Sequence, residues 1–149
     1  MGTHYNGSKK VMRALDSYIK LMRAADTINS AVNLSLSKFG LTESQFNVLD
    51  ALYHLGPLSQ KELGYKLLKS GGNITMVIDN LEKDAYVERR RGTEDRRIFF
   101  VHLTKEGGEK LEEILPMKVN FITNEMNRLN KTEQIELQRL CKKIGIRKP

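Results

Sequence analysis

The chain of 149 residues is long enough for one domain with a hydrophobic core, and its 40% hydrophobic and 29% charged residues are ordinary for a globular protein in water. No apolar run approaches the roughly 20 residues of a membrane span, and the first residues lack the apolar core of a signal peptide. Cys141 is the only cysteine, which excludes internal disulfides and clustered-cysteine zinc sites. We therefore expect a cytoplasmic protein that does not bind membranes. Its net charge of +7 favours an anionic partner.

The segment 8–39 is predicted to form one long helix, because it contains neither proline nor glycine. Its apolar residues, among them Leu15, Tyr18, Met22 and Leu36, cover more than one stripe of that helix. One small layer cannot cover such a width, so we expect the helix to pack against a second copy of the chain. A long core helix within a monomer is the alternative.

A pair of short helices follows, separated by a tight turn. Capping-box patterns open two helices, T-x-x-Q at 42–45 and S-x-x-E at 59–62, and Gly56-Pro57 ends the first of them. Small residues at 70–73 then separate the second from a further helix that runs to about Asp84. Two short helices joined by a small-residue turn are typical of a helix-turn-helix.

The helix 71–84 has an apolar face, and its other face carries short and mostly uncharged side chains. The major groove, ~12 Å wide, admits a helix only if the leading side chains are small; Asn pairs with adenine, and Thr or Met methyls touch thymine. A solvated polar face is the alternative, but such a face normally carries Lys and Glu pairs, and Asp79 is the only charged residue in 70–80. The predicted DNA-reading residues are Ser70, Gly72, Asn73, Thr75, Met76 and Asn80.

A β-hairpin with a charged tip is predicted next, since strand-forming segments at 86–91 and 98–103 flank a turn at 92–95. Arginines at such a tip can lie along phosphates or enter a narrow minor groove. Asp95 would weaken DNA binding unless it pairs with an arginine, so we assign it an orienting role. A charged edge hairpin that only resists aggregation is the alternative. The predicted DNA contacts of this wing are Arg89, Arg90, Arg91, Arg96 and Arg97.

Two more helices complete the chain. Thr104 is expected to cap a helix that runs to about Leu129 with a kink near Pro116, and the pattern at 130–133 opens a last helix that ends at Gly145.

The single cysteine lies in this last helix. Cys141 shares an apolar stripe with Leu137, Leu140 and Ile144, so we expect it to pack as a small hydrophobe. Redox sensing, helped by the lysines at 142–143, is the alternative.

The run 41–107 resembles the winged-helix core of the MarR (multiple antibiotic resistance regulator) family along its whole length. The motifs that carry the resemblance are LTESQFNVL (41–49), GPLSQKEL (56–63), SGGNIT (70–75), IDNLEK (78–83), DRR (95–97) and VHLTKEG (101–107). The resemblance implies a single, mostly α domain with a small β-hairpin wing (α+β). Its winged helix-turn-helix lobe would span 41–104, flanked by dimerisation helices at 8–39 and 105–146.

The same resemblance implies a homodimer that binds double-stranded DNA at a pseudo-palindromic operator, with its recognition helices about one helical turn apart, ~34 Å. Members of the family typically repress nearby genes until a small aromatic or phenolic acid binds. Residue type alone makes Tyr18, Met22, Tyr53 and His54 candidates to line that ligand site. The glycines at 71–72 depart from the bulkier or proline-containing entry of many members, so the recognition helix here would start less rigidly.

No enzyme site is expected, and no cofactor. His4, His54 and His102 are far apart in sequence, and the chain has no phosphate-binding glycine loop, G-x-S-x-G motif or closely spaced metal ligands. The competing function is a winged helix used only for protein contacts. It predicts that the wing arginines are dispensable, whereas DNA binding predicts that losing them lowers affinity and flattens its salt dependence.

Overall fold

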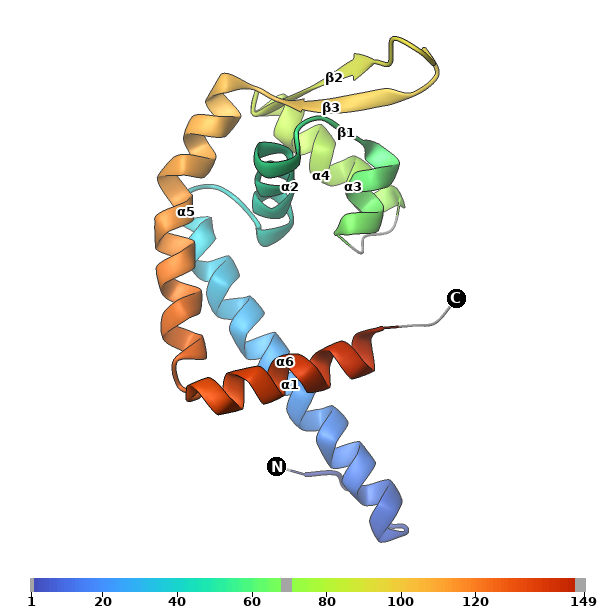
Figure 1. Ribbon diagram of the computed structural model, residues 1–149, viewed down its shortest axis with the longest axis vertical. Coiled ribbons are helices and arrows are strands. Elements are labelled where there is room, and N and C mark those ends of the chain that lie inside the picture. The colour runs from blue at the N-terminus through green and yellow to red at the C-terminus, as the bar shows by residue number, and fades with distance from the viewer. Residues whose placement is uncertain (1, 68–70, 147–149) are drawn as a thin grey trace.

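A computed structural model of the chain describes residues 2–67 and 71–146. The elements are α1 (Lys9–Ser37), α2 (Glu43–Leu55), β1 (Leu58–Ser59), α3 (Gln60–Lys66), α4 (Gly71–Lys83), β2 (Val87–Arg91), β3 (Phe99–Leu103), α5 (Lys105–Met126) and α6 (Lys131–Gly145). Figure 1 shows α2, α3, α4 and the sheet gathered in a lobe at one end, with α1 and α5 leading away from it. No helix in these two described ranges is long and apolar enough to cross a bilayer.

Capping residues explain where most helices begin. Thr42, Ser59 and Asn130 each form a capping box with the Gln or Glu three residues later, as the sequence predicted. Two helices end earlier than expected, α1 at Ser37 and α5 at Met126. Pro116 lies inside α5 and does not end it.

The predicted hairpin is part of a three-stranded antiparallel sheet in the order β1-β3-β2. Strands β2 and β3 pair from Val87 opposite Leu103 to Arg91 opposite Phe99. Strand β1 pairs Leu58 with Val101, a contact that the sequence analysis missed because a two-residue strand has no periodicity to detect.

The hydrophobic core lies in the lobe and continues into the two long helices. Leu49, Leu63, Ile78 and Val101 are fully buried, which places α2, α3, α4 and β3 around one centre. From the long helices, Leu36 at the end of α1 and the apolar residues near the start of α5 join the same core. The lobe and the long helices therefore share one hydrophobic core.

A tight junction fixes α5 to the lobe. The Thr104 hydroxyl donates to the carbonyl of Ala85 at 2.7 Å and accepts from the N–H of Gly107 at 3.0 Å. A side chain at Gly107 would collide with the backbone carbonyl of Tyr86, so only glycine fits there. These contacts explain why a threonine and a glycine stand at these two positions of the VHLTKEG run. They also hold the start of α5 against the turn before β2.

Candidate nucleic-acid interface

Helix α4 presents a face of small uncharged groups. Ile74 and Ile78 are buried, whereas Asn73, Asn80 and Met76, which is 58% exposed, lie on the outer side. Gly72 is also exposed, and Thr75 is half-buried at the edge of this face. Ser70, which was predicted to join them, lies outside the described residues.

One edge of the α4 face borders the start of α2. A groove of about 280 Å³ separates the two helices, and it is lined by Thr42, Ser44 and Gln45 of α2 and by Asn73, Met76, Val77 and Asn80 of α4. No sequence pattern indicated that α2 lies at this surface. Its capping box predicted the helix start but gave no information on which helix lies beside it.

The other edge borders α3. The side-chain amide of Gln60, the first residue of α3, donates to the Thr75 hydroxyl across 2.5 Å. In the sequence, Gln60 stands only as an inner residue of a capping box, so its contact with Thr75 was not predicted.

At the tip of the wing, Asp95 holds Arg97 through both of its carboxylate oxygens. Arg97 Nε lies 3.0 Å from Oδ1 and Nη2 lies 3.1 Å from Oδ2, and the backbone N–H of Arg97 also donates to Oδ1. These hydrogen bonds lower the pKa of Asp95 and raise the pKa of Arg97. The side chain of Arg97 stays 90% exposed. An outward, geometrically fixed guanidinium is the arrangement that the orienting role of Asp95 requires.

The other tip arginines differ in their surroundings. Arg96 is exposed and forms no ion pair with any residue in the described part of the chain. Arg91 stacks on the ring of Phe99, with its Cζ 5.1 Å from the centroid, which orders it without neutralising it. Arg90 pairs with Glu88 on the same strand.

Arg89 turns away from the tip and ties β2 to α4. Its guanidinium lies 2.5 Å from Asp79 and 3.0 Å from Glu82, and its backbone N–H donates to Glu82 at 2.9 Å. The side chain is only 20% exposed. Arg89 was predicted among the DNA contacts, but its position is that of a link between the wing and α4. In the sequence, this link was indicated by two acids that lie three residues apart on one face of the helix.

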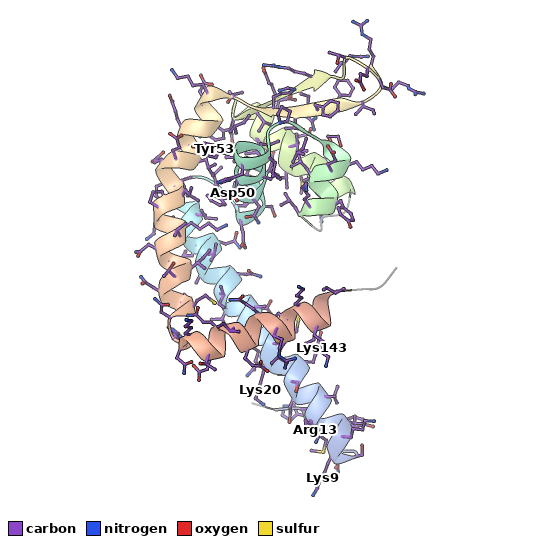
Figure 2. All side chains as sticks on the ribbon, viewed as in Figure 1. Lys9, Arg13, Lys20, Asp50, Tyr53 and Lys143 are labelled. Atoms are coloured by element: carbon purple, nitrogen blue, oxygen red, sulfur yellow. The ribbon has the colours of Figure 1, made fainter. Side chains whose placement is uncertain are left out.

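The four candidate ligand-lining residues do not come together within one chain. The Tyr53 hydroxyl donates to Glu112 of α5 at 2.9 Å, and His54 Nδ1 lies 3.3 Å from an oxygen of Asp50. Figure 2 shows Tyr53 in the lobe, far from Lys20 on α1, which stands between Tyr18 and Met22 in the sequence. Within the single chain, the two α1 residues and the two α2 residues therefore lie on separate surfaces.

A buried lysine joins α2 to α5 beside this region. Lys118 is 7% exposed, with its Nζ 3.9 Å from the ring centroid of Phe46 and 3.2 Å from Oδ1 of Asn47. Burial lowers the pKa of Lys118, and the charges of Glu43 and Asp50 oppose that shift. Nothing in the sequence distinguished this lysine from a surface one.

An apolar surface on the long helices is left uncovered by the residues that the structure describes. Tyr18 and Met22 of α1 are 61% and 41% exposed, and α6 exposes a stripe that includes Leu140 and Ile144. Cys141 in that stripe is exposed, so the prediction that it packs as a hydrophobe is wrong for the single chain. The structure describes no buried residue in α6.

The lobe of α2, α3 and α4, with a sheet whose hairpin projects beside α4, defines the winged helix-turn-helix class of transcription regulator. The family model described as "MarR family" matches residues 41–99. The uncharacterized HTH-type transcriptional regulator YkoM of Bacillus subtilis is 33% identical over 93% of this chain and 90% of its own. The HTH-type transcriptional regulator MhqR of the same organism is 32% identical over 90% and 92%.

The fold matches that of BpsR from Bordetella bronchiseptica. The BpsR structure was solved to explain how 6-hydroxynicotinic acid regulates the DNA binding of that protein. The TM-score is 0.84 at 23% identity, over 98% of this chain and 100% of BpsR. The chain belongs to the MarR family. It is a helix-turn-helix transcription regulator and not an enzyme.

Proposed function

We propose that the protein is a cytoplasmic repressor that binds a pseudo-palindromic double-stranded DNA operator as a homodimer. The observation that carries the proposal is the outer face of α4, where Asn73, Met76 and Asn80 are exposed and small enough to reach base edges. Helix α4 would lie in the major groove. The start of α2 borders the same face and would face the phosphate backbone.

The wing supplies the second part of the interface. Arg96 and Arg97 project from the turn between β2 and β3, and Arg97 is held in one geometry by Asp95. Guanidinium groups at such a tip bind phosphates or the negative potential of a narrow minor groove. Phosphate contacts set affinity and register, and α4 sets the sequence preference.

The uncovered apolar surface of α1 and α6 supports the homodimer. Large exposed hydrophobic residues on two helices outside the core are typical of a surface that another chain covers. A twofold-symmetric pair would place two α4 helices on one face of the DNA, in register with two half-sites about 34 Å apart.

The test is selection of bound sequences from a random double-stranded DNA pool, followed by affinity measurements at several salt concentrations. We expect a pseudo-palindromic consensus and a steep salt dependence. Arg97→Ala should reduce the salt slope by about 2, because each of the two subunits loses one phosphate contact. The matched control is Arg128→Ala, which removes an exposed arginine that also pairs with a neighbouring acid, Glu125, but lies at the end of α5.

Binding without a consensus would refute sequence-specific recognition. If Arg97→Ala and Arg128→Ala then behaved alike, the winged helix would serve protein contacts instead.

We further propose that a small aromatic or phenolic acid releases the DNA by acting where α2 meets α5. Tyr53 and Lys118 join these helices, so a ligand that rearranged them would shift the lobe relative to α5. Salicylate is a suitable probe, with operator affinity measured by fluorescence anisotropy. We expect weaker binding with salicylate and a smaller effect in Tyr53→Phe. Unchanged affinity at millimolar salicylate would remove support for this class of ligand.

A further inference from the structure

An aromatic side chain near the tip of the wing orders one of the predicted DNA contacts. Phe99 begins β3 and pairs across the hairpin with Arg91, the last residue of β2. The Cζ of Arg91 lies 5.1 Å from the centroid of the Phe99 ring, within the range of a cation–π contact. Among the described residues, the one further polar contact of this guanidinium joins its Nη1 to the backbone oxygen of Arg96 across 3.5 Å. That distance is too long for a strong hydrogen bond, so the ring is the main constraint on the Arg91 side chain.

The strand register places this pair on the side of the wing that faces the recognition helix. Alternate residues of a strand point to opposite faces of a sheet, so Val87, Arg89 and Arg91 share one face. On that face, Val87 is buried in the lobe and Arg89 contacts α4. Arg91 and Phe99 continue the same face toward the tip, where both side chains are exposed. Arg91 therefore flanks the helix that would lie in the major groove.

The charge of Arg91 is available to an anion. In the described part of the chain it forms no ion pair with a carboxylate, whereas Arg90 pairs with Glu88 and Arg89 pairs with two acids of α4. A cation–π contact orients a guanidinium over a ring and leaves the N–H groups at its edge able to donate. A phosphate can therefore bind Arg91 without displacing Phe99.

We propose that Phe99 is a positioning residue, whose ring holds Arg91 ready to bind a phosphate of the operator. An arginine that is already ordered loses less side-chain freedom when it binds, so preorganisation raises affinity. This inference rests on the proposed operator binding. It gives Phe99 a role in affinity that does not require the ring to touch DNA.

The experiment is a double-mutant cycle measured on the selected operator. Phe99→Leu keeps a large apolar side chain but removes the aromatic face. It should weaken operator binding about tenfold, because each of the two subunits loses a contact that changes binding about threefold. In an Arg91→Ala background the same substitution should change affinity by less than about twofold, since the side chain that Phe99 orders is then absent.

Salt dependence separates positioning from a collapse of the wing. Arg91→Ala should reduce the salt slope by about 2, because each subunit loses one phosphate contact. Phe99→Leu retains the charge of Arg91, so it should weaken binding with an unchanged slope. A collapsed wing would also withdraw Arg96 and Arg97, and the slope would then fall.

A conservative substitution tests whether the aromatic face is what matters. Phe99→Tyr keeps a ring that can hold the guanidinium, so its operator affinity should stay within about twofold of the wild type. Thermal unfolding confirms that each variant is folded.

The outcomes distinguish this inference from the function on which it rests. No selected consensus for the wild-type protein would refute the proposed operator binding itself. Where a consensus is found, an Arg91→Ala variant that binds it as tightly as the wild type would overturn the inference alone. So would an equal loss from Phe99→Leu in both backgrounds, because Phe99 would then act independently of Arg91. A Phe99→Tyr variant as weak as Phe99→Leu would overturn it as well.

Discussion

The guanidinium of Arg89 lies 2.5 Å from the carboxylate of Asp79, so strand β2 is tied directly to helix α4. Glu82, one turn further along α4, pairs with Nη1 of the same guanidinium. It also accepts a hydrogen bond from the backbone N–H of Arg89. The wing and the recognition helix are therefore parts of one rigid unit. Their relative position decides whether both can contact DNA at once.

Arg89→Ala should weaken operator binding by loosening the wing and not by removing a phosphate contact. We expect about a tenfold loss of affinity with an unchanged salt slope, since the charge of Arg89 is already paired with two acids. The free energy of unfolding should fall by about 1 kcal/mol, as expected for a partly exposed ion pair. Salt-dependent anisotropy and urea unfolding measure the two effects.

Arg97→Ala is the comparison for Arg89→Ala, because it lies on the same hairpin but projects outward. It should reduce the salt slope, and because it removes only the exposed pairing with Asp95, it should lower the free energy of unfolding less than Arg89→Ala does. A reduced salt slope in Arg89→Ala would show that Arg89 reaches DNA after all.

Asp95→Asn should change the pH dependence of stability. The hydrogen bonds from Arg97 lower the pKa of Asp95, so the folded protein binds a proton at this group less tightly than the unfolded chain. The stabilisation is complete above the unfolded pKa, about 3.9, and is lost as pH falls through the lower folded value. We therefore expect the wild type to have a higher melting temperature than Asp95→Asn at pH 6, and this difference to shrink progressively as pH falls below about 3.9. A difference in melting temperature that does not shrink on acidification would contradict this pairing.

The helices, the hairpin and the family were predictable because they depend on local chemistry. Short segments are enough to show the capping boxes at Thr42 and Ser59 and the helical spacing of the apolar residues in α4. The contact of Gln60 with Thr75 was not predictable, because it joins residues fifteen positions apart on two helices. Lys118 is a similar case. A lysine in an amphipathic helix normally lies in water, and only the fold shows that this one is buried against Phe46.

Lys118→Met tests the buried charge between α2 and α5. The lost contact with the Phe46 ring is offset because the buried ammonium no longer has to be desolvated, so stability at pH 7 should change by less than about 1 kcal/mol. The direction in which stability changes with pH follows from the shifted pKa. Burial lowers the pKa of Lys118, so the wild type loses the charge before the unfolded chain does as pH rises. Its stability should therefore increase relative to Lys118→Met as pH approaches about 10.4.

Urea unfolding of both proteins between pH 7 and pH 10 measures this difference. Curves for the two proteins that run parallel over the whole range would show that Lys118 is as solvated in the fold as in the unfolded chain.

The exposed stripe on α6 provides the test of the homodimer. Leu140 is 42% exposed in the single chain, so burying the rest of its side chain contributes roughly 1 kcal/mol. A twofold axis counts each contact twice, and the introduced carboxylate adds a desolvation cost, so Leu140→Glu should raise the dimer dissociation constant by at least about 30-fold. Gln138→Glu adds the same charge to another face of α6 and should leave the dimer intact. Sedimentation velocity over a range of concentrations distinguishes the two variants. A Leu140→Glu protein that remains dimeric would show that α6 does not form the interface. A monomer that binds full operators as tightly as the wild type would show that dimerisation is not needed for recognition.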